Sequence, residues 1–440
     1  MKLRIAATLA LTLALTGCGG AGTPADRASD ACSQYTRYGR HDNTTVTITG
    51  PIRNAEADKL LRSWGEFEDC TGITVDYSGI AAFEQDLKDR ADTGHPPDLA
   101  LFPQPGLIAD MAHGHGLRPV SADVRANVQR WYSAAWQTYG TVDGELYAAP
   151  LNANIKSLVW YSPSFFAKHG YQTPATWDEM LRLTERIAAD GVKPWCAGAE
   201  SGAASGFPIT DWLEDVLLRT AGPDVYDAWV AHKIPFNDAR IVDALDKVGA
   251  ILRDPRYVNG GYGGVQSIAT VAMSEGGLPI LQQTCAMHRQ ASFYANEWPD
   301  GTRIGPDGDV YAFYLPPMDP DRARVVLGAG EFVGAFATRP EVQAVAAYLS
   351  TPQWADRRAR LGGAVSANQA IDRTALRSPI ERLSAELLTD PDTVFRFDAS
   401  DMMPAAVGTG TFWTGMIDWL NGKPTKDVLD AIERSWPAGP

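Results

Sequence analysis

Residues 46–102 read VTITGPIRNAEADKLLRSWGEFEDCTGITVDYSGIAAFEQDLKDRADTGHPPDLALF, and this stretch decides the fold class. Val46 and Ile48 alternate with threonines, which is typical of a short β-strand. The periodicity then predicts, in order, a helix over 54–69, a strand over 73–77, a helix from Phe83 and a strand over 99–102. Strands that alternate with helices form parallel sheets with covered faces, so the sequence predicts an α/β fold.

A similar alternation of strands and helices returns in the middle of the chain. Residues 157–161 indicate a strand, and Thr176-Trp177-Asp178-Glu179 is typical of a capping box at the start of a helix. Thr210 and Asp211 predict the start of another helix, which ends near Gly222. We therefore expect a second α/β unit after the first.

The end of the chain predicts a return toward the first unit. Residues 327–336 are rich in glycine and predict a strand, and helical segments follow from Pro340 to Trp436. A chain of 440 residues is longer than one hydrophobic core usually supports. These observations predict two lobes joined by a few hinge strands, with a cleft between the lobes.

The N-terminal residues predict export and a lipid anchor. An uncharged, largely apolar run over 5–15 is too short to span a bilayer and fits a secretory signal. Leu15-Thr16-Gly17-Cys18 resembles the lipobox of bacterial lipoproteins, in which the cysteine becomes the acylated first residue. We therefore expect a lipoprotein signal peptide over 1–17 and a flexible tether over 18–31. The mature protein would be extracytoplasmic and anchored to the cell membrane through Cys18.

Four cysteines follow Cys18, and an even number in an exported chain favours two disulfides. Three pairings are possible for four cysteines. We favour Cys32 with Cys70 and Cys196 with Cys285, because each pair would then link one region of the chain locally.

The charge distribution argues against a nucleic acid partner. The net charge is −14, and acidic and basic residues are interspersed without a basic stripe.

Motifs that carry common catalytic chemistry are missing from the sequence. We find no Gly-x-Ser-x-Gly elbow and no phosphate-binding loop. His113 and His115 have no acidic or cysteine partner at metal-ligand spacing, so a solvated turn explains them better than a zinc site. Paired carboxylates for glycoside hydrolysis need not be adjacent in sequence, and the chain has 53 acidic residues. An exported glycoside hydrolase that acts on α-glucans is therefore the alternative hypothesis.

Several segments, in order and spacing, resemble the extracellular solute-binding proteins of ABC sugar importers, the group that includes maltose-binding protein. The resemblance is greatest to the α-glucoside-binding branch. The matching segments are 97–106 (PDLALFPQPG), 156–161 (KSLVWY), 193–196 (KPWC), 285–293 (CAMHRQASF), 328–332 (GAGEF) and 403–413 (MPAAVGTGTFW).

This resemblance implies a two-lobe, periplasmic-binding-protein-like α/β fold with a hinge and an interlobe cleft. It implies a monomer without catalytic residues, metal or cofactor, which captures an oligosaccharide and delivers it to the transmembrane subunits of an ABC permease. The expected organisation is a first part of lobe 1 over 32–152, the main part of lobe 2 over 153–325, and a hinge return with shared C-terminal helices over 326–440.

The resemblance also implies ligand-binding positions, which supply the flat aromatic rings, amides and carboxylates that bind sugars. They are Ser78, Phe102, Gln104, Glu200, Ser201, Phe207, Gln290, Phe293, Glu331 and Trp413.

Some of these positions have a structural alternative. Many relatives have tryptophan at the position of Phe293, which leaves the strength of stacking there open. In the alternative interpretation, Phe102 packs in the core, and Glu331 is a surface or hinge carboxylate without a ligand role. The sequence does not identify the sugar, and trehalose, maltose-type oligomers and sucrose all fit the class.

Overall fold

The residues that predict alternating strands and helices form the parallel sheet of the first lobe. β1 (Thr44–Gly50) pairs in parallel with β2 (Ile73–Gly79) on one side and with β3 (Leu99–Phe102) on the other. The apolar residues of β1 point into the core, where Val46 and Ile48 are fully buried. The predicted α/β fold is confirmed.

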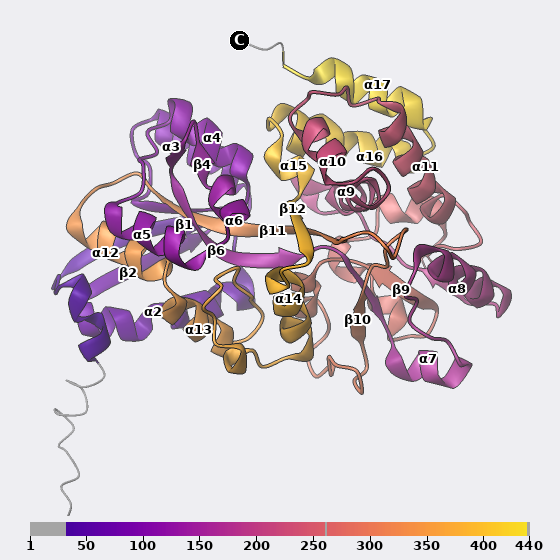
Figure 1. Cartoon of the computed structure of the whole chain (residues 1–440), viewed down its shortest axis with the longest axis horizontal. Coiled ribbons are helices and arrows are strands. Elements are labelled where there is room, and N and C mark those ends of the chain that lie inside the picture. Colours follow the sequence, from indigo (N-terminus) through magenta and orange to yellow (C-terminus); the bar gives the residue numbers. More distant parts are fainter. Residues whose placement is uncertain (1–31, 260–261, 438–440) are drawn as a thin grey trace, which may run out of the picture.

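The computed structural model describes residues 32–259 and 262–437, which form two lobes side by side (Figure 1). The predicted signal peptide 1–17 and the tether 18–31, which includes Cys18, lie outside the described residues. Within the described ranges, no helix combines the length and the apolar character that a membrane span requires.

Helices surround the sheet of the first lobe. The elements on this side are η1 (Ser33–Tyr38), α2 (Asn54–Thr71), α3 (Phe83–Asp92), α4 (Pro105–Gly114), α5 (Ala122–Trp131), α6 (Ala134–Tyr139), β4 (Thr141–Val142), β5 (Glu145–Leu146), α12 (Pro340–Leu349) and α13 (Pro352–Arg360).

The second lobe has a smaller sheet with the strand order β10-β7-β9-β8. Its strands are β7 (Leu158–Tyr161), β8 (Lys193–Trp195), β9 (Cys285–Arg289) and β10 (Tyr311–Tyr314). Its helices and helical turns are α7 (Pro163–His169), α8 (Trp177–Ala189), η2 (Gly202–Ala204), α9 (Phe207–Ala221), α10 (Pro223–Val230), α11 (Ala239–Leu252), η3 (Val265–Ala269), η4 (Met273–Glu275), η5 (Leu278–Ile280), η6 (Ser292–Asn296), α15 (Ala399–Met402), the π-helical η8 (Ala406–Phe412), α16 (Trp413–Leu420) and α17 (Thr425–Ser435).

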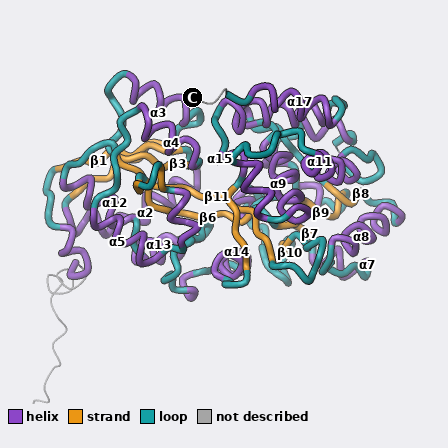
Figure 2. The backbone as a smooth tube through the Cα atoms, turned by 45° about the horizontal axis from the view of Figure 1, so that its top comes forward, coloured by secondary structure: helices purple, strands orange, loops and turns teal. Residues whose placement is uncertain are grey.

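One long strand connects the two lobes. β11 (Arg324–Ala335) pairs with β12 (Thr393–Phe397) near its start, with β6 (Ala148–Ile155) in its middle and with β3 near its end. β6 and β11 run together from one lobe to the other (Figures 1 and 2). α14 (Pro379–Thr389) packs against β6 and β12 beside this crossing, with η7 (Arg373–Ala375) before it.

Alternation along β7 divides its side chains between two cores. Val159 packs in the core of the second lobe, whereas Leu158 and Trp160 pack in the core that continues into the first lobe. The sequence-based boundaries between residues 152 and 153 and between 325 and 326 fall within β6 and β11, and this division of the chain stays a prediction.

Two predicted helix starts can be compared with the structure. Thr176 is the N-cap of α8, but Glu179 accepts the hydrogen bond from Ala175 instead of from Thr176, so only half of the capping box is as expected. α9 begins at Phe207, and the predicted start at Thr210 and Asp211 is therefore wrong. Both residues are buried within the helix, and the Asp211 carboxylate forms an ion pair.

Both predicted disulfides are confirmed. Cys32 bonds to Cys70 and links η1 to the end of α2, and Cys196 bonds to Cys285 and links the end of β8 to the start of β9. Each disulfide lies within one region, as expected.

Paired alanine substitution of either disulfide is expected to lower the free energy of unfolding by about 4 kcal/mol. The reason is that the cross-links join residues separated by 38 and 89 positions and restrict the unfolded chain. Urea unfolding of C32A/C70A and C196A/C285A measures the effect. An unchanged midpoint, or alkylation of these cysteines without reductant, would contradict the structural role.

Candidate functional site

A buried lysine lies where the chain crosses from the first lobe to the second. Lys156 follows β6, and its Nζ donates to Asp211 Oδ1 at 2.9 Å and also bonds to Asp398. The Lys156 side chain is 8% exposed and both carboxylates are fully buried. Burial alone would lower the pKa of Lys156, but the two carboxylates raise it well above its ordinary value. The ammonium therefore stays charged inside the protein.

The polar network continues from Lys156 to the neighbouring hinge strand, β11. Ser157 Oγ donates to Asp215 Oδ1 at 2.9 Å and accepts from the backbone N of Leu327 at 2.9 Å. Arg219 and Arg289 also bond to Asp215, which belongs to α9. This network attaches β6 and β11 to one helix of the second lobe.

The third crossing segment, β12, joins the same network through α15. Glu214 accepts hydrogen bonds from the backbone N of Ala399 at 2.9 Å and of Ser400 at 3.1 Å. Burial would raise the pKa of Asp398, but Lys156 and neighbouring hydrogen bonds hold it at about 2. Burial raises the pKa of Asp211 to about 6. The cluster thus contains a firmly ionised pair, Lys156 and Asp398, beside more easily protonated carboxyls.

Two predicted aromatic residues lie beside this network. The Phe207 ring centroid is 5.8 Å from Lys156 Nζ, and Trp413 Nε1 donates to Ser400 Oγ at 3.3 Å. A β-carbon at Gly206 would lie 2.1 Å from the carbonyl oxygen of Trp413, so the start of α9 packs directly on Trp413. Both residues are partly buried.

The predicted polar residues of this region lie on the loop before α9. Glu200 is exposed and accepts from the backbone N of Gly202 at 2.8 Å, and Ser201 is half-buried. The loop is held against the start of α9 because Gly206 N donates to Ala199 O at 2.9 Å.

The first lobe meets this surface at the start of α4. Gln104 is the N-cap residue of α4 and is buried. A β-carbon at Gly106 would lie 2.9 Å from Met403 O and 3.1 Å from Asp401 O, so α4 touches the end of α15 and the residue that follows it. Gln104, Phe207 and Trp413 therefore belong to elements that meet between the lobes.

A second group of predicted residues lies along the other part of the hinge. Glu331 is half-buried on β11 opposite Asn152 of β6, and the strand pairing shifts between Glu331 and Phe332. Burial, together with the nearby Glu56, raises the pKa of Glu331 to about 7. Phe293 lines a pocket together with Asn154, Ser292, Ala295, Gly363, Ala364, Val365, Ile380, Glu381 and Ser384.

Three predicted ligand positions are not part of either group. Phe102 is 0% exposed and its ring packs on Phe336 in the core of the first lobe, with centroids 6.4 Å apart. Gln290 is also 0% exposed, and its side-chain oxygen accepts from Ala291 N at 2.8 Å. Neither side chain reaches a surface, so the proposed ligand set does not include them. Ser78 is exposed at the end of β2.

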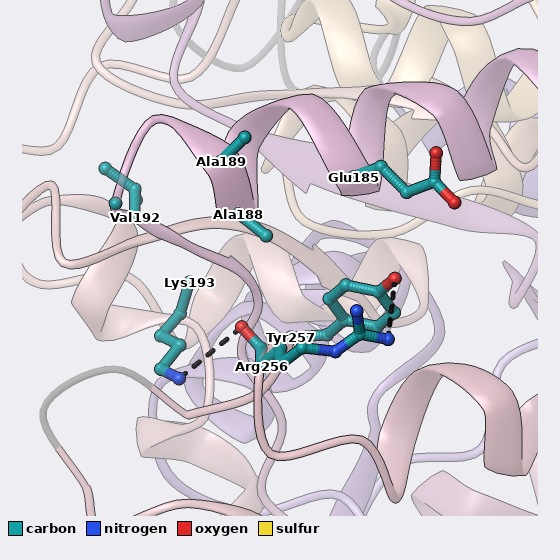
Figure 3. A pocket seen from close by; sticks show the side chains of 8 residues that line it. Glu185, Ala188, Ala189, Val192, Lys193, Arg256 and Tyr257 are labelled. Carbon is teal, nitrogen blue, oxygen red and sulfur yellow. Dashed lines mark hydrogen bonds between the residues drawn. The ribbon is translucent and has the colours of Figure 1, made fainter.

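A further pocket lies away from the hinge. It has a volume of ≈ 670 Å³ and lies between the end of α8 and the start of β8, beside Arg256 and Tyr257 (Figure 3). Lys193 and Arg256 line it, and Lys193 Nζ donates to Pro255 O at 2.6 Å. It shares no residue with the predicted ligand set.

The carboxylates could be mistaken for a metal site. Asp211, Glu214 and Asp398 place oxygens within 4.8 Å of one another, but the Lys156 ammonium already bonds to two of these groups and supplies the compensating charge. The histidines predicted to form a solvated turn do have acidic partners in space: His113 bonds to Asp143 and His115 to Asp92. These partners are distant in the chain, and their carboxylates are solvent-exposed.

Residues 43–354 match the family described as bacterial extracellular solute-binding protein. The chain belongs to this family. It is a substrate-binding protein of an ABC sugar importer, acts outside the cytoplasm and is not an enzyme. The alternative of an exported glycoside hydrolase therefore has no support from its relatives.

Two relatives match over most of the chain. The osmoprotective compounds-binding protein GgtB of Synechocystis is 40% identical over 439 residues, covering 99% of this chain and 100% of the relative. The alpha-glucosides-binding periplasmic protein AglE of Rhizobium meliloti is 37% identical over 401 residues, covering 89% and 87%. The solved structure of a chitin oligosaccharide binding protein has a TM-score of 0.74 at 18% identity, covering 90% of this chain and 98% of that one, which supports the two-lobe fold.

Replacement of Lys156 by methionine is expected to destabilise this solute-binding protein by about 3–5 kcal/mol, because it leaves Asp211 and Asp398 buried without a counterion. Chemical denaturation at neutral pH measures the loss. The matched control is Lys88→Met, which removes a half-exposed ion pair to Asp110 and should cost less than about 1 kcal/mol. Equal effects of the two substitutions would contradict the account.

Proposed function

We propose that this solute-binding protein is lipid-anchored and captures an α-glucoside or a related oligosaccharide between its lobes for delivery to the permease. The observation that carries the proposal is the convergence of Phe207 and Trp413 beside the buried charges of Lys156 and Asp398. Glu200, Ser201 and Gln104 lie on elements next to these rings and supply polar groups.

The chemistry of a sugar fits this combination. A pyranose presents apolar C–H groups to an aromatic ring and hydroxyls to polar side chains at its edge. Trp413 is partly buried, and the hydrogen bond from its indole N–H to Ser400 fixes the orientation of the ring that we propose stacks on the sugar.

The relatives support two ligand classes. AglE is named for binding α-glucosides, and GgtB is named for binding osmoprotective compounds. We favour an α-glucoside because the aromatic rings suit a sugar, and the similarity to GgtB makes small osmoprotective solutes the second candidate. The protein would function as a monomer, held at the membrane by the tether over 18–31.

Trehalose, maltose or sucrose is expected to raise the melting temperature, because a ligand that binds only the folded state stabilises it by mass action. Titration calorimetry should give saturable binding without hydrolysis products. Cellobiose, a β-linked isomer of maltose, should bind more weakly. Replacement of Trp413 by alanine should lower the affinity by about 30-fold, equivalent to about 2 kcal/mol.

The control for this substitution is Trp131→Ala. Trp131 ends α5 in the first lobe and contacts Arg130, whereas Phe207 and Trp413 belong to α9 and α16 of the second lobe. An equal loss of sugar affinity in both variants, or none in the Trp413 variant, would rule out stacking on Trp413.

Replacement of Cys18 by alanine is expected to release the protein from the membrane, because acylation of this cysteine would be its anchor. Fractionation of bacteria that produce the wild type and the variant, with labelling by radioactive palmitate, measures the change. An unlabelled wild type, or a variant that stays in the membrane fraction, would refute the anchor.

A further inference from the structure

Trp413 lies directly after an irregular stretch of helix. It is the first residue of α16 and follows the π-helical η8. Turns of π-helix are rare and frequently lie at functional sites. A β-carbon at Gly408 of η8 would collide with the carbonyl oxygen of Ser400, so α15 packs closely on η8. This packing places the Ser400 hydroxyl next to the Trp413 indole, whose Nε1 donates to Ser400 Oγ at 3.3 Å.

The Ser400 hydroxyl continues this hydrogen bond toward the ion pair at the lobe crossing. Its Oγ donates to Asp398 Oδ1 at 2.6 Å, and Asp398 Oδ2 accepts from Lys156 Nζ. Burial would raise the pKa of Asp398, but Lys156 and neighbouring hydrogen bonds lower it to about 2, so the carboxyl group is ionised at neutral pH. A continuous chain of hydrogen bonds thus runs from Lys156 through Asp398 and Ser400 to Trp413.

The chemistry of its members gives this chain one direction. An ammonium and an indole N–H can only donate, and a carboxylate can only accept. The Ser400 hydroxyl must therefore give its single proton to Asp398 and present a lone pair to the Trp413 N–H. If its proton pointed at Trp413 instead, two donors would face each other. Hydrogen bonds in a chain also polarise and strengthen one another, so the ion pair supports the bond to the indole.

Ser400 is itself held in place. It is 2% exposed, and its backbone N donates to Glu214 Oε1 of α9 at 3.1 Å. The backbone carbonyl of Trp413 lies against Gly206 at the start of the same helix. The main chain and the indole N–H of Trp413 are therefore both attached to groups that α9 supports.

The ammonium at the start of the chain also contacts the second aromatic residue of the proposed site. Lys156 Nζ is 5.8 Å from the ring centroid of Phe207, which is within the range of cation–π attraction. The same charge thus supports Phe207 directly and Trp413 through Asp398 and Ser400.

We propose that Ser400 is a positioning residue, which relays the placement of the Lys156–Asp398 ion pair to the Trp413 ring. This inference rests on the proposed function and deepens it: Ser400 acts on the ligand only through Trp413. A ring that is ordered before the ligand arrives binds it more tightly, because less side-chain freedom is lost on binding.

The first test is a double-mutant cycle, measured by titration calorimetry with trehalose, maltose and sucrose. Ser400→Ala should weaken binding by about threefold to tenfold, because the ligand must then order the indole. Trp413→Phe keeps a ring for stacking and lacks the N–H, so Ser400→Ala in that background should change the affinity by less than about twofold. Ser400→Thr retains the hydroxyl and should keep the affinity within about twofold of the wild type.

The second test observes the indole N–H without any ligand, by nuclear magnetic resonance of protein with isotope-labelled tryptophan. The Trp413 signal is the one that is missing from the spectrum of Trp413→Phe. Ser400→Ala should shift this signal and make its proton exchange faster with water, because the indole has lost its acceptor. Ser400→Thr should leave the signal near its wild-type position.

Ser63→Ala is the matched control. Ser63 Oγ accepts from Trp354 Nε1 at 2.9 Å in the core of the first lobe, so the same kind of hydrogen bond is removed far along the chain from Trp413. This substitution should shift the Trp354 signal and leave the sugar affinity within about twofold of the wild type.

The melting temperature of each ligand-free variant separates lost binding from lost folding. If Ser400→Ala does not fold, Ser400→Cys provides the comparison, because a thiol is only a weak hydrogen-bond acceptor.

The outcomes separate the two proposals. A wild type that binds none of these sugars would overturn the proposed function and, with it, the role of Ser400 in binding. A wild type that binds, together with a folded Ser400→Ala variant of unchanged affinity or unchanged Trp413 signal, would overturn the positioning role alone. Equal losses of affinity from Ser400→Ala in the wild type and in the Trp413→Phe background would make Ser400 a structural residue and would likewise overturn it.

Discussion

The structure depends on one electrostatic constraint: a lysine ammonium is buried where the chain crosses between two lobes. Moving an ion out of water is costly unless it is paired, so Lys156 requires Asp211 and Asp398 to lie within bonding distance. Asp211 belongs to α9 of the second lobe, whereas Asp398 directly follows β12. The pairing therefore fixes the ends of two crossing segments to one helix, and Ser157 adds β11 to the same attachment.

The ion pairs of Lys156 attach the crossing segments to the second lobe, and this attachment limits where the lobes can move during ligand capture. When the second lobe moves as a unit with α9 and α15, a change in the angle between the lobes must occur in β6 and β11 rather than within the lobe. Contacts between the lobes outside the hinge are made by small or irregular elements, such as Gly106 against the end of α15 and Gly363 against Asn296. The groups proposed to hold the ligand lie next to these contacts, so opening would expose them and closing would surround a sugar.

Much of the fold could be predicted because its signals are local. Alternation over 44–50 and 73–79 and helical spacing over 54–71 are properties of neighbouring residues, and they identify the parallel sheet of the first lobe. The disulfides were also predictable, since cysteines in an exported chain pair with high probability and few pairings exist. β12 was missed because TVFRF is short and lies among helices, and only its pairing with β11 makes it a strand.

The chemistry between the lobes was harder to predict because its partners are distant in sequence. Lys156 and Asp398 are 242 positions apart, and nothing near either residue indicates the other. Phe102 lay in a segment that resembled a ligand loop, yet its ring is needed in the core at the end of β3. Lys156 belongs to the segment 156–161 (KSLVWY), which resembles the family. A charged residue beside this largely apolar strand was the one signal in the sequence for a buried ion pair.

We propose that a sugar is held between the lobes against Trp413 without chemical change. A crystal structure of the protein with maltose or trehalose would show whether this is so. We expect an intact sugar whose ring lies on the Trp413 indole, with side chains of both lobes around it. A sugar bound only in the outer pocket lined by Lys193 and Arg256, or a cleaved sugar between the lobes, would contradict it.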